Sequence, residues 1–251
     1  MTSAAAAYRA DGGDGPLVVR AASVAGVRHR LAGGAGEDAY AWRAGEGWVF
    51  AAVADGVSAT EGAALASASA VDAASAAGAD VLTRAEELAK GAAAACRAAV
   101  GAADRAVRDA TRSGPAGATT LVVAAVTGEG DWSLLRVGDS TAFVLVGSGA
   151  WTEAFPATGD GGGVADTATA ALPADEAATE QANGHLEAGE ALFLVTDGVA
   201  GPLRDGPETV VPAFAAALAA PPPPLDLALL ADFSRQGCHD DRTVVGIWRP
   251  S

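Results

Sequence analysis

Acidic residues in this chain of 251 residues occur where apolar runs begin or end. They are Glu37-Asp38, Asp55-Gly56, Asp139, Asp197-Gly198 and Asp240-Asp241. The apolar runs are typical of β-strands, and carboxylates at strand ends can converge on one edge of a sheet core. Gathered there, they would repel one another and destabilise the fold unless cations neutralised them. The pattern therefore predicts a metal site.

The donor atoms indicate which metal would suit such a site. Oxygen ligands favour Mg²⁺ or Mn²⁺, whereas a zinc or copper site normally shows His or Cys at defined spacings, which this sequence lacks. In each Asp-Gly pair, Asp supplies a carboxylate and Gly lets a carbonyl or ligand approach closely. A lone Asp-Gly pair is also a common turn, so the prediction depends on the preceding apolar runs and on the whole set.

Short β-rich runs and longer helical stretches must position these residues. We expect strands at 17–24, 38–43, 48–54, 119–127, 131–137, 141–146, 191–196 and 243–248, and helices near 61–77, 84–112, 210–219 and 225–235. The segment 147–189 lacks periodicity, and we expect it to form a flap. Runs of strands separated by helix pairs favour an α+β fold, with two antiparallel sheets packed as a central sandwich and helix pairs on both outer faces.

Composition limits the partners and the compartment. The chain has 31 acidic and 16 basic residues, and its net charge of -15 disfavours nucleic acid and anionic lipid as partners. Residues 1–15 lack a signal-peptide pattern, so we expect a disordered tail followed by one domain at 16–251. Cys96 and Cys238 form no C-x-x-C pair, and prolines interrupt the most apolar later stretch. We expect a soluble, cytoplasmic monomer without a membrane segment.

Several short motifs carry a resemblance to a known family. They are G-E-D-A-Y at 36–40, V-A-D-G-V at 53–57, G-A-T-T-L at 117–121, V-G-D-S at 137–140, V-T-D-G-V at 195–199 and D-D-R-T-V at 240–244. In this order they resemble the motifs of the type-2C metal-dependent protein phosphatases, over nearly the whole chain. The leading S-x-x-G-x-x-H, read as Ser23, Gly26 and His29, is similar to a bacterial branch in which His stands near the position usually given to a phosphate-binding Arg.

The resemblance implies a ligand set for two metal ions and a weaker third. Its members are Glu37, Asp55, the Gly56 carbonyl, Asp197, Asp240 and, for the third ion, Asp139 with Asp197. Asp55 would bridge the first two ions, and Asp38 would orient metal-bound water. Gly201 stands where some relatives place a further aspartate, which leaves the affinity for a third ion open.

A phosphate contact and a proton donor must come from other residues, and Arg28, His29 and Arg30 are the candidates. His29 is the first choice, because of the family spacing and because an imidazole pKa near neutrality suits proton donation. Which of the three contacts phosphate stays open. His239 lies beside the last acidic motif and could either support the site or be an exposed loop residue.

These features predict hydrolysis of phosphoserine and phosphothreonine in phosphorylated proteins. Two Mg²⁺ or Mn²⁺ ions would activate a bridging hydroxide for in-line attack, without a phosphoenzyme. One alternative is a catalytically silent regulatory module that keeps the fold and binds a phosphoprotein. Another is an alanine-rich helical scaffold, which would need no acid cluster.

Overall fold

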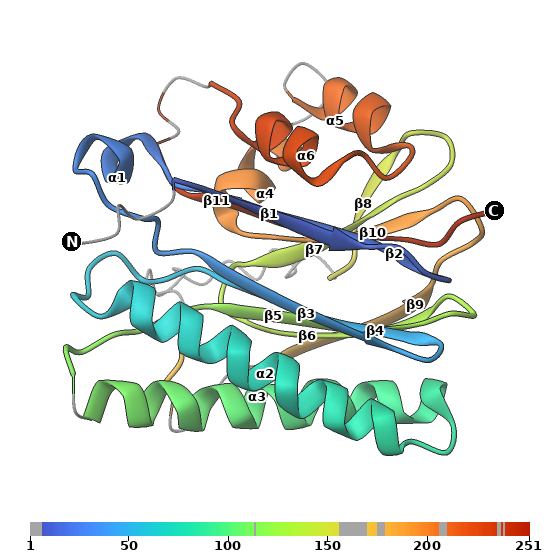
Figure 1. The fold of residues 1–251 in the computed structure, drawn as a ribbon, viewed down its shortest axis with the longest axis horizontal. Coiled ribbons are helices and arrows are strands. Elements are labelled where there is room, and N and C mark those ends of the chain that lie inside the picture. The colour runs from blue at the N-terminus through green and yellow to red at the C-terminus, as the bar shows by residue number, and fades with distance from the viewer. Residues whose placement is uncertain are drawn as a thin grey trace, which may run out of the picture.

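The structure is a computed structural model that describes residues 7–112, 114–155, 170–174, 179–205, 210–234, 237 and 239–251. Two antiparallel sheets pack face to face between two layers of helices (Figure 1). In spatial order the first sheet contains β1 (Tyr8–Gly13), β2 (Val18–Val24), β11 (Arg242–Trp248), β10 (Ala191–Val195), β7 (Thr141–Leu145) and β8 (Trp151–Glu153). The second contains β3 (Ala39–Gly45), β4 (Trp48–Ala54), β5 (Leu121–Thr127), β6 (Asp131–Val137) and β9 (Glu180–His185). The predicted α+β sandwich is confirmed.

Helices cover the outer face of each sheet. The long antiparallel pair α2 (Ala63–Arg84) and α3 (Leu88–Arg112) lies on the five-stranded sheet (Figure 1). On the six-stranded sheet lie α4 (Asp197–Arg204), α5 (Val211–Leu218) and α6 (Pro224–Ala231), so in the described residues this layer has a third helix beyond the expected pair. None of the described helices is long and apolar enough to span a membrane.

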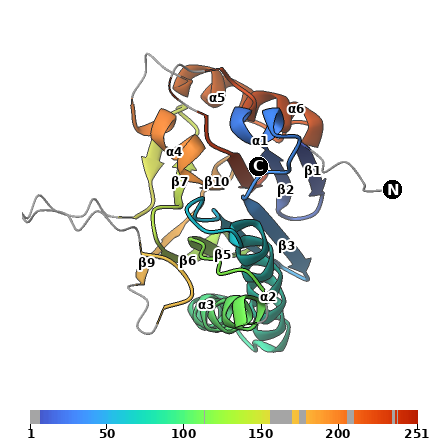
Figure 2. The same ribbon diagram turned by 90° about the vertical axis from the view of Figure 1, so that its left-hand side faces the viewer.

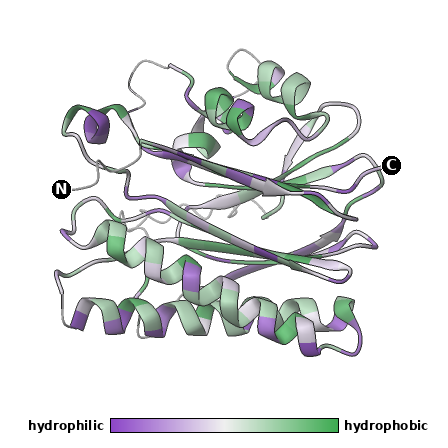
Figure 3. Cartoon of the chain, in the orientation of Figure 1, coloured by the Kyte–Doolittle hydropathy of each residue, from purple (hydrophilic) through white to green (hydrophobic). Residues whose placement is uncertain are grey.

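The two helical layers pack by different means. Buried alanines of α2 and α3 let these helices lie close to the sheet, and a Cβ on Gly78 would lie 2.4 Å from the Phe50 ring. On the other face, the aromatic rings of Phe193, Phe214 and Trp248 fill the space beneath short helices. Figure 3 shows apolar residues along the helices of both layers, mixed with hydrophilic ones on α2 and α3, whereas α1 (Val27–Leu31) is largely hydrophilic. Each buried Val, Leu or Phe contributes about 1.5–3 kcal/mol.

Two expectations about irregular segments need correction. The disordered tail expected at residues 1–15 is wrong for β1, which pairs antiparallel with β2, and Asp11 there accepts hydrogen bonds from Tyr40 and Trp42. Residues 1–6 lie outside the described part. The expected flap at 147–189 is wrong for β8 and β9, which pair with β7 and β6. Residues 156–169 and 175–178 of the flap also lie outside the described part.

Candidate functional site

Strand register places the acidic motifs at one end of the sandwich. In the five-stranded sheet Ala39 pairs with Ala54 and Leu121 with Val137, so the residues just before β3 and just after β4 and β6 lie together. In the six-stranded sheet Val195 pairs with Val244, so the residues after β10 and before β11 reach the same end. Figure 2 looks onto this end, where α1, α4 and one end of α2 lie.

A cavity of about 460 Å³ opens between these strand ends. Its lining contains most of the predicted site residues, namely Arg28, His29, Glu37, Asp55, Gly56, Asp139, Asp197 and Asp240. Val57, Ser58, Thr120, His239 and Asp241 complete the lining. Residues separated by up to about 200 positions in the sequence therefore meet at one site.

Two predicted residues do not line this cavity. Arg30 points away from it, and its Nη1 lies 3.0 Å from Asp232 Oδ1 and 2.8 Å from the Tyr8 hydroxyl. Asp38 borders a separate cavity of about 250 Å³. Its Oδ2 accepts a hydrogen bond of 2.9 Å from Thr196 Oγ1, whereas Oδ1 is buried without a hydrogen-bond partner among the described residues.

The carboxyl groups at this end raise one another's pKa. Burial, followed by the charges of Asp38 and Asp197, raises the pKa of Asp55 to about 10. Burial and the charge of Asp241 raise the pKa of Asp38 to about 8, and burial and Asp139 raise that of Asp197. Carboxyls this close to one another are stable only with a proton or a cation between them.

Backbone contacts hold the Asp55-Gly56 turn at the cavity. The Thr120 hydroxyl accepts the Asp55 N–H at 3.1 Å, and the Thr120 N–H donates to the Asp55 carbonyl at 2.8 Å. The Gly56 N–H donates to the Glu37 carbonyl at 3.2 Å, which joins two acidic motifs directly. A Cβ on Gly56 would lie 2.8 Å from the Ala63 and Glu37 carbonyl oxygens, so no larger residue fits here.

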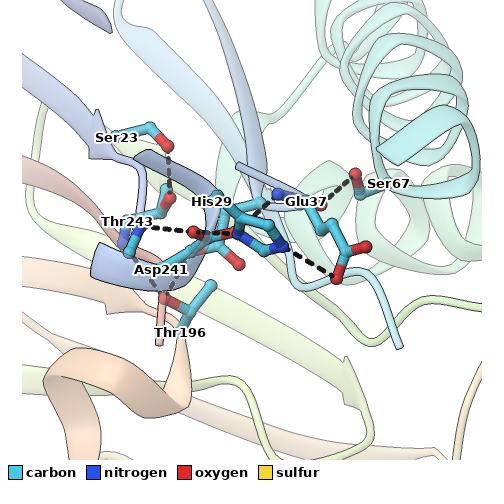
Figure 4. A network of polar contacts seen from close by, with 9 residues as sticks. Ser23, His29, Glu37, Ser67, Thr196, Asp241 and Thr243 are labelled. Atoms are coloured by element: carbon cyan, nitrogen blue, oxygen red, sulfur yellow. Dashed lines mark hydrogen bonds and ion pairs between the residues drawn. The ribbon is translucent and has the colours of Figure 1, made fainter. Parts of the chain in front are cut away.

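His29 faces the cavity from the one-turn helix α1. Its Nδ1 lies 2.8 Å from Asp241 Oδ1, and its Nε2 lies 3.7 Å from Glu37 Oε2 (Figure 4). The hydrogen bond with Asp241 is the main cause of a raised His29 pKa, which partial burial opposes. The imidazole therefore carries a proton more readily than a free histidine does.

Of the two neighbouring arginines, only Arg28 is placed to reach a ligand in the cavity. Arg28 is exposed at the cavity lining, and no ion pair joins it to another of the described residues. Arg30 is already engaged by Asp232 and Tyr8.

Asp241 is the residue of this site that sequence reasoning missed. It is only 7% exposed, and its carboxylate accepts the N–H groups of Gly26 and Glu37 as well as contacting His29. The resemblance assigned the adjacent Asp240 as the metal ligand and left Asp241 without a role. The only sequence feature that could have indicated its role is the pair of adjacent aspartates in D-D-R-T-V.

The residues present fit a divalent-cation site in their chemistry. The donors are oxygen atoms, which suit Mg²⁺ or Mn²⁺, and Glu37 Oε2 is buried without a hydrogen-bond partner among the described residues. In that part of the chain, however, no set of three or more Asp, Glu, His or Cys side chains is already gathered so that it could hold an ion.

The sequence matches the family profile described as "Protein phosphatase 2C" over residues 25–224. A comparison with curated proteins finds no match.

Solved structures share the fold over nearly the whole chain. The serine/threonine phosphatase PstP/Ppp of Mycobacterium tuberculosis is 23% identical with a TM-score of 0.63, covering 94% of this chain and 99% of its own. The PstP catalytic domain with two manganese ions is 24% identical with a TM-score of 0.59, covering 92% and 97%. RsbX with magnesium is 14% identical with a TM-score of 0.57, covering 95% and 98%. At these identities the likeness establishes the fold.

Proposed function

Because the chain belongs to the protein phosphatase 2C family, we propose that it is a metal-dependent phosphatase that hydrolyses phosphoserine and phosphothreonine in proteins. The observation that carries this proposal is the meeting of six acidic residues with Arg28 and His29 around one cavity. Phosphoester hydrolysis needs cations near the phosphoryl oxygens and a proton for the leaving alkoxide, and this cavity has residues for both.

The acidic residues would hold the cations. The proposed ligands are Asp55 between two ions, Asp197 and Asp240 on the first, Glu37 and the Gly56 carbonyl on the second, and Asp139 with Asp197 on a weaker third. Mg²⁺ and Mn²⁺ are the proposed ions, as the RsbX structure holds magnesium and the PstP structure holds two manganese ions. When bound, such ions lower the pKa of a bridging water and offset charge on the phosphoryl oxygens.

The remaining residues would handle the phosphate and the protons. Arg28 would pair with a non-bridging phosphoryl oxygen, because it is a cation at the cavity with no competing carboxylate in the described residues. His29, whose raised pKa favours the protonated form, would donate a proton to the leaving alkoxide. Asp38, close enough to Asp55 to raise its pKa, would orient the attacking water. We no longer assign phosphate binding to Arg30, because it pairs with Asp232.

The test is a Mn²⁺ titration of activity on an aryl phosphate and on a phosphothreonine peptide. Wild type should show Mn²⁺-dependent hydrolysis, and Asp55→Asn should lose about 10²-fold or more in kcat because it weakens a ligand shared by two cations. Asp131→Asn is the matched control, since Asp131 pairs with His185 away from the cavity.

Two results would count against the proposal. Equal kcat for wild type and Asp55→Asn would remove Asp55 from the cation site. Phosphopeptide binding by wild type with no turnover at any Mn²⁺ concentration would instead favour the silent regulatory module.

A further inference from the structure

The Asp241 carboxylate lies at the junction of three chain segments. Its Oδ1 is 2.6 Å from the Gly26 amide nitrogen and 2.8 Å from His29 Nδ1. Its Oδ2 accepts the Glu37 N–H. A carboxylate is an acceptor only, so an ionised Asp241 requires a proton on His29 Nδ1.

Glycines at this junction bring the backbone against Asp241 from several sides. A Cβ on Gly36 would lie 2.7 Å from Asp241 Oδ2, and a Cβ on Gly198 would lie 2.1 Å from the Asp241 carbonyl oxygen. A Cβ on Gly26 would lie 2.2 Å from the His239 carbonyl oxygen in the same segment. The contact at Gly36 limits rotation of the Asp241 side chain, and the contacts at Gly26 and Gly198 hold the backbone of residues 239–241 in place.

A proton on Nδ1 determines what His29 presents to the cavity. With Nδ1–H directed at Asp241, Nε2 is the ring atom on the side of Glu37, whose Oε2 is 3.7 Å away (Figure 4). Nε2 is then the atom available to a phosphoryl or alkoxide oxygen.

We propose that Asp241 is a positioning residue whose carboxylate holds the His29 imidazole with Nδ1–H inward and Nε2 facing the cavity, while tying the Glu37 backbone to the same point. The role of Nε2 at the phosphate rests on the proposed phosphatase function, whereas the orientation of the ring does not. Asparagine cannot replace Asp241, because either orientation of its amide directs an NH₂ group at an N–H that the carboxylate accepts.

Nuclear magnetic resonance of the histidine rings tests the orientation directly. The chain has three histidines, so a His29→Gln sample assigns the His29 signals. We expect wild type to show a protonated Nδ1 whose hydrogen is protected from exchange with water, and Asp241→Asn to lose this protection. Asp232→Asn is the matched control, since Asp232 lies beside Arg30 and not at His29.

Kinetics at saturating Mn²⁺ tests whether Asp241 acts through His29. We expect His29→Gln and Asp241→Asn each to lower kcat about 10²-fold, and the double variant to fall far short of the product of the two losses. Asp232→Asn should stay within about twofold of wild type, as expected for independent sites.

The outcomes separate this inference from the proposed function. A wild-type His29 with an unprotonated Nδ1 overturns the positioning role, and this spectrum needs no variant to fold. Single-variant losses that multiply in the double variant also overturn it. If wild type has no phosphatase activity, the proposed function fails, and the ring spectrum still decides whether Asp241 orients His29.

Discussion

Glu153 and the cavity carboxylates around Asp55 lie near the same end of the sandwich but differ in how their negative charge is balanced. Glu153 on β8 accepts hydrogen bonds from Arg204 Nε at 3.0 Å and from the Thr141 hydroxyl at 2.8 Å, and Arg136 lies 3.8 Å away. Burial alone would raise the pKa of Glu153, but Arg204 and Thr141 outweigh it and lower that pKa. At Asp55, burial and neighbouring carboxylates raise the pKa to about 10.

The difference shows that arginine is available near this end, but among the described residues no arginine forms an ion pair with Asp55. The pKa of Arg204 is raised mainly by its hydrogen bonds to Glu153, and the charges of Asp139 and Asp197 also contribute. Pairing the cavity carboxylates with arginine would stabilise the metal-free fold and leave no charge to attract a cation. We infer that repulsion among the carboxyl groups around Asp55 lowers the stability of the metal-free protein and is retained because it attracts cations.

The comparison is tested most strongly by replacing Asp55. The neutral Asp55→Asn variant should be more stable than wild type without metal, because it removes repulsion with Asp38 and Asp197. Mn²⁺ at 100 times its Kd should stabilise wild type by about 2.7 kcal/mol, and most of this gain should vanish in the variant. Thermal unfolding with Mn²⁺ and with EDTA measures both effects. A metal-free variant less stable than wild type would contradict the inference that repulsion around Asp55 lowers stability.

A smaller effect should distinguish the two arginines of α1. Arg28→Ala should lower kcat/KM about tenfold to 10²-fold, or ~1.4–2.7 kcal/mol, because it removes a cation from the cavity. Arg30→Ala is the matched control, and it should keep near-normal kcat/KM while losing its pairing with Asp232 and Tyr8. Steady-state kinetics on a phosphothreonine peptide measures both variants. The reverse order of losses would place the phosphate contact at Arg30.

The smallest effect concerns Glu153, whose negative charge is balanced by Arg204 and Arg136. Glu153→Gln should cost about 1 kcal/mol at pH 7, because Arg204 and Arg136 lose an ionised partner that is partly exposed. Since the folded-state pKa is below the ordinary value of 4.5, this stabilisation is present above pH 4.5 and is lost as the pH falls through the folded-state pKa. Urea unfolding of both proteins at pH 7 and below pH 4 measures the difference. A difference that grew in acid would contradict the assignment.

Sequence reasoning found elements whose pattern is local and strong. The apolar stripe of α3 and the continuous apolar runs of β4 and β5 are buried as expected. It missed β1, β8 and β9, whose residues include many Gly, Asp and Glu and are largely exposed or half-buried. Such strands form because a partner strand supplies their hydrogen bonds, and the local sequence pattern does not indicate which segment will be that partner.

At the candidate site, the sequence by itself determined the type of donor and its place at a strand end, because residue chemistry and strand periodicity are local properties. Only the tertiary structure decided which donors meet. Arg28 and Arg30 are two positions apart on one turn of helix, so they point in different directions, and Asp232 with Tyr8 engages one of them. The tertiary structure also decided the partners of Asp241, because Gly26 and Glu37 are more than 200 residues from it along the chain.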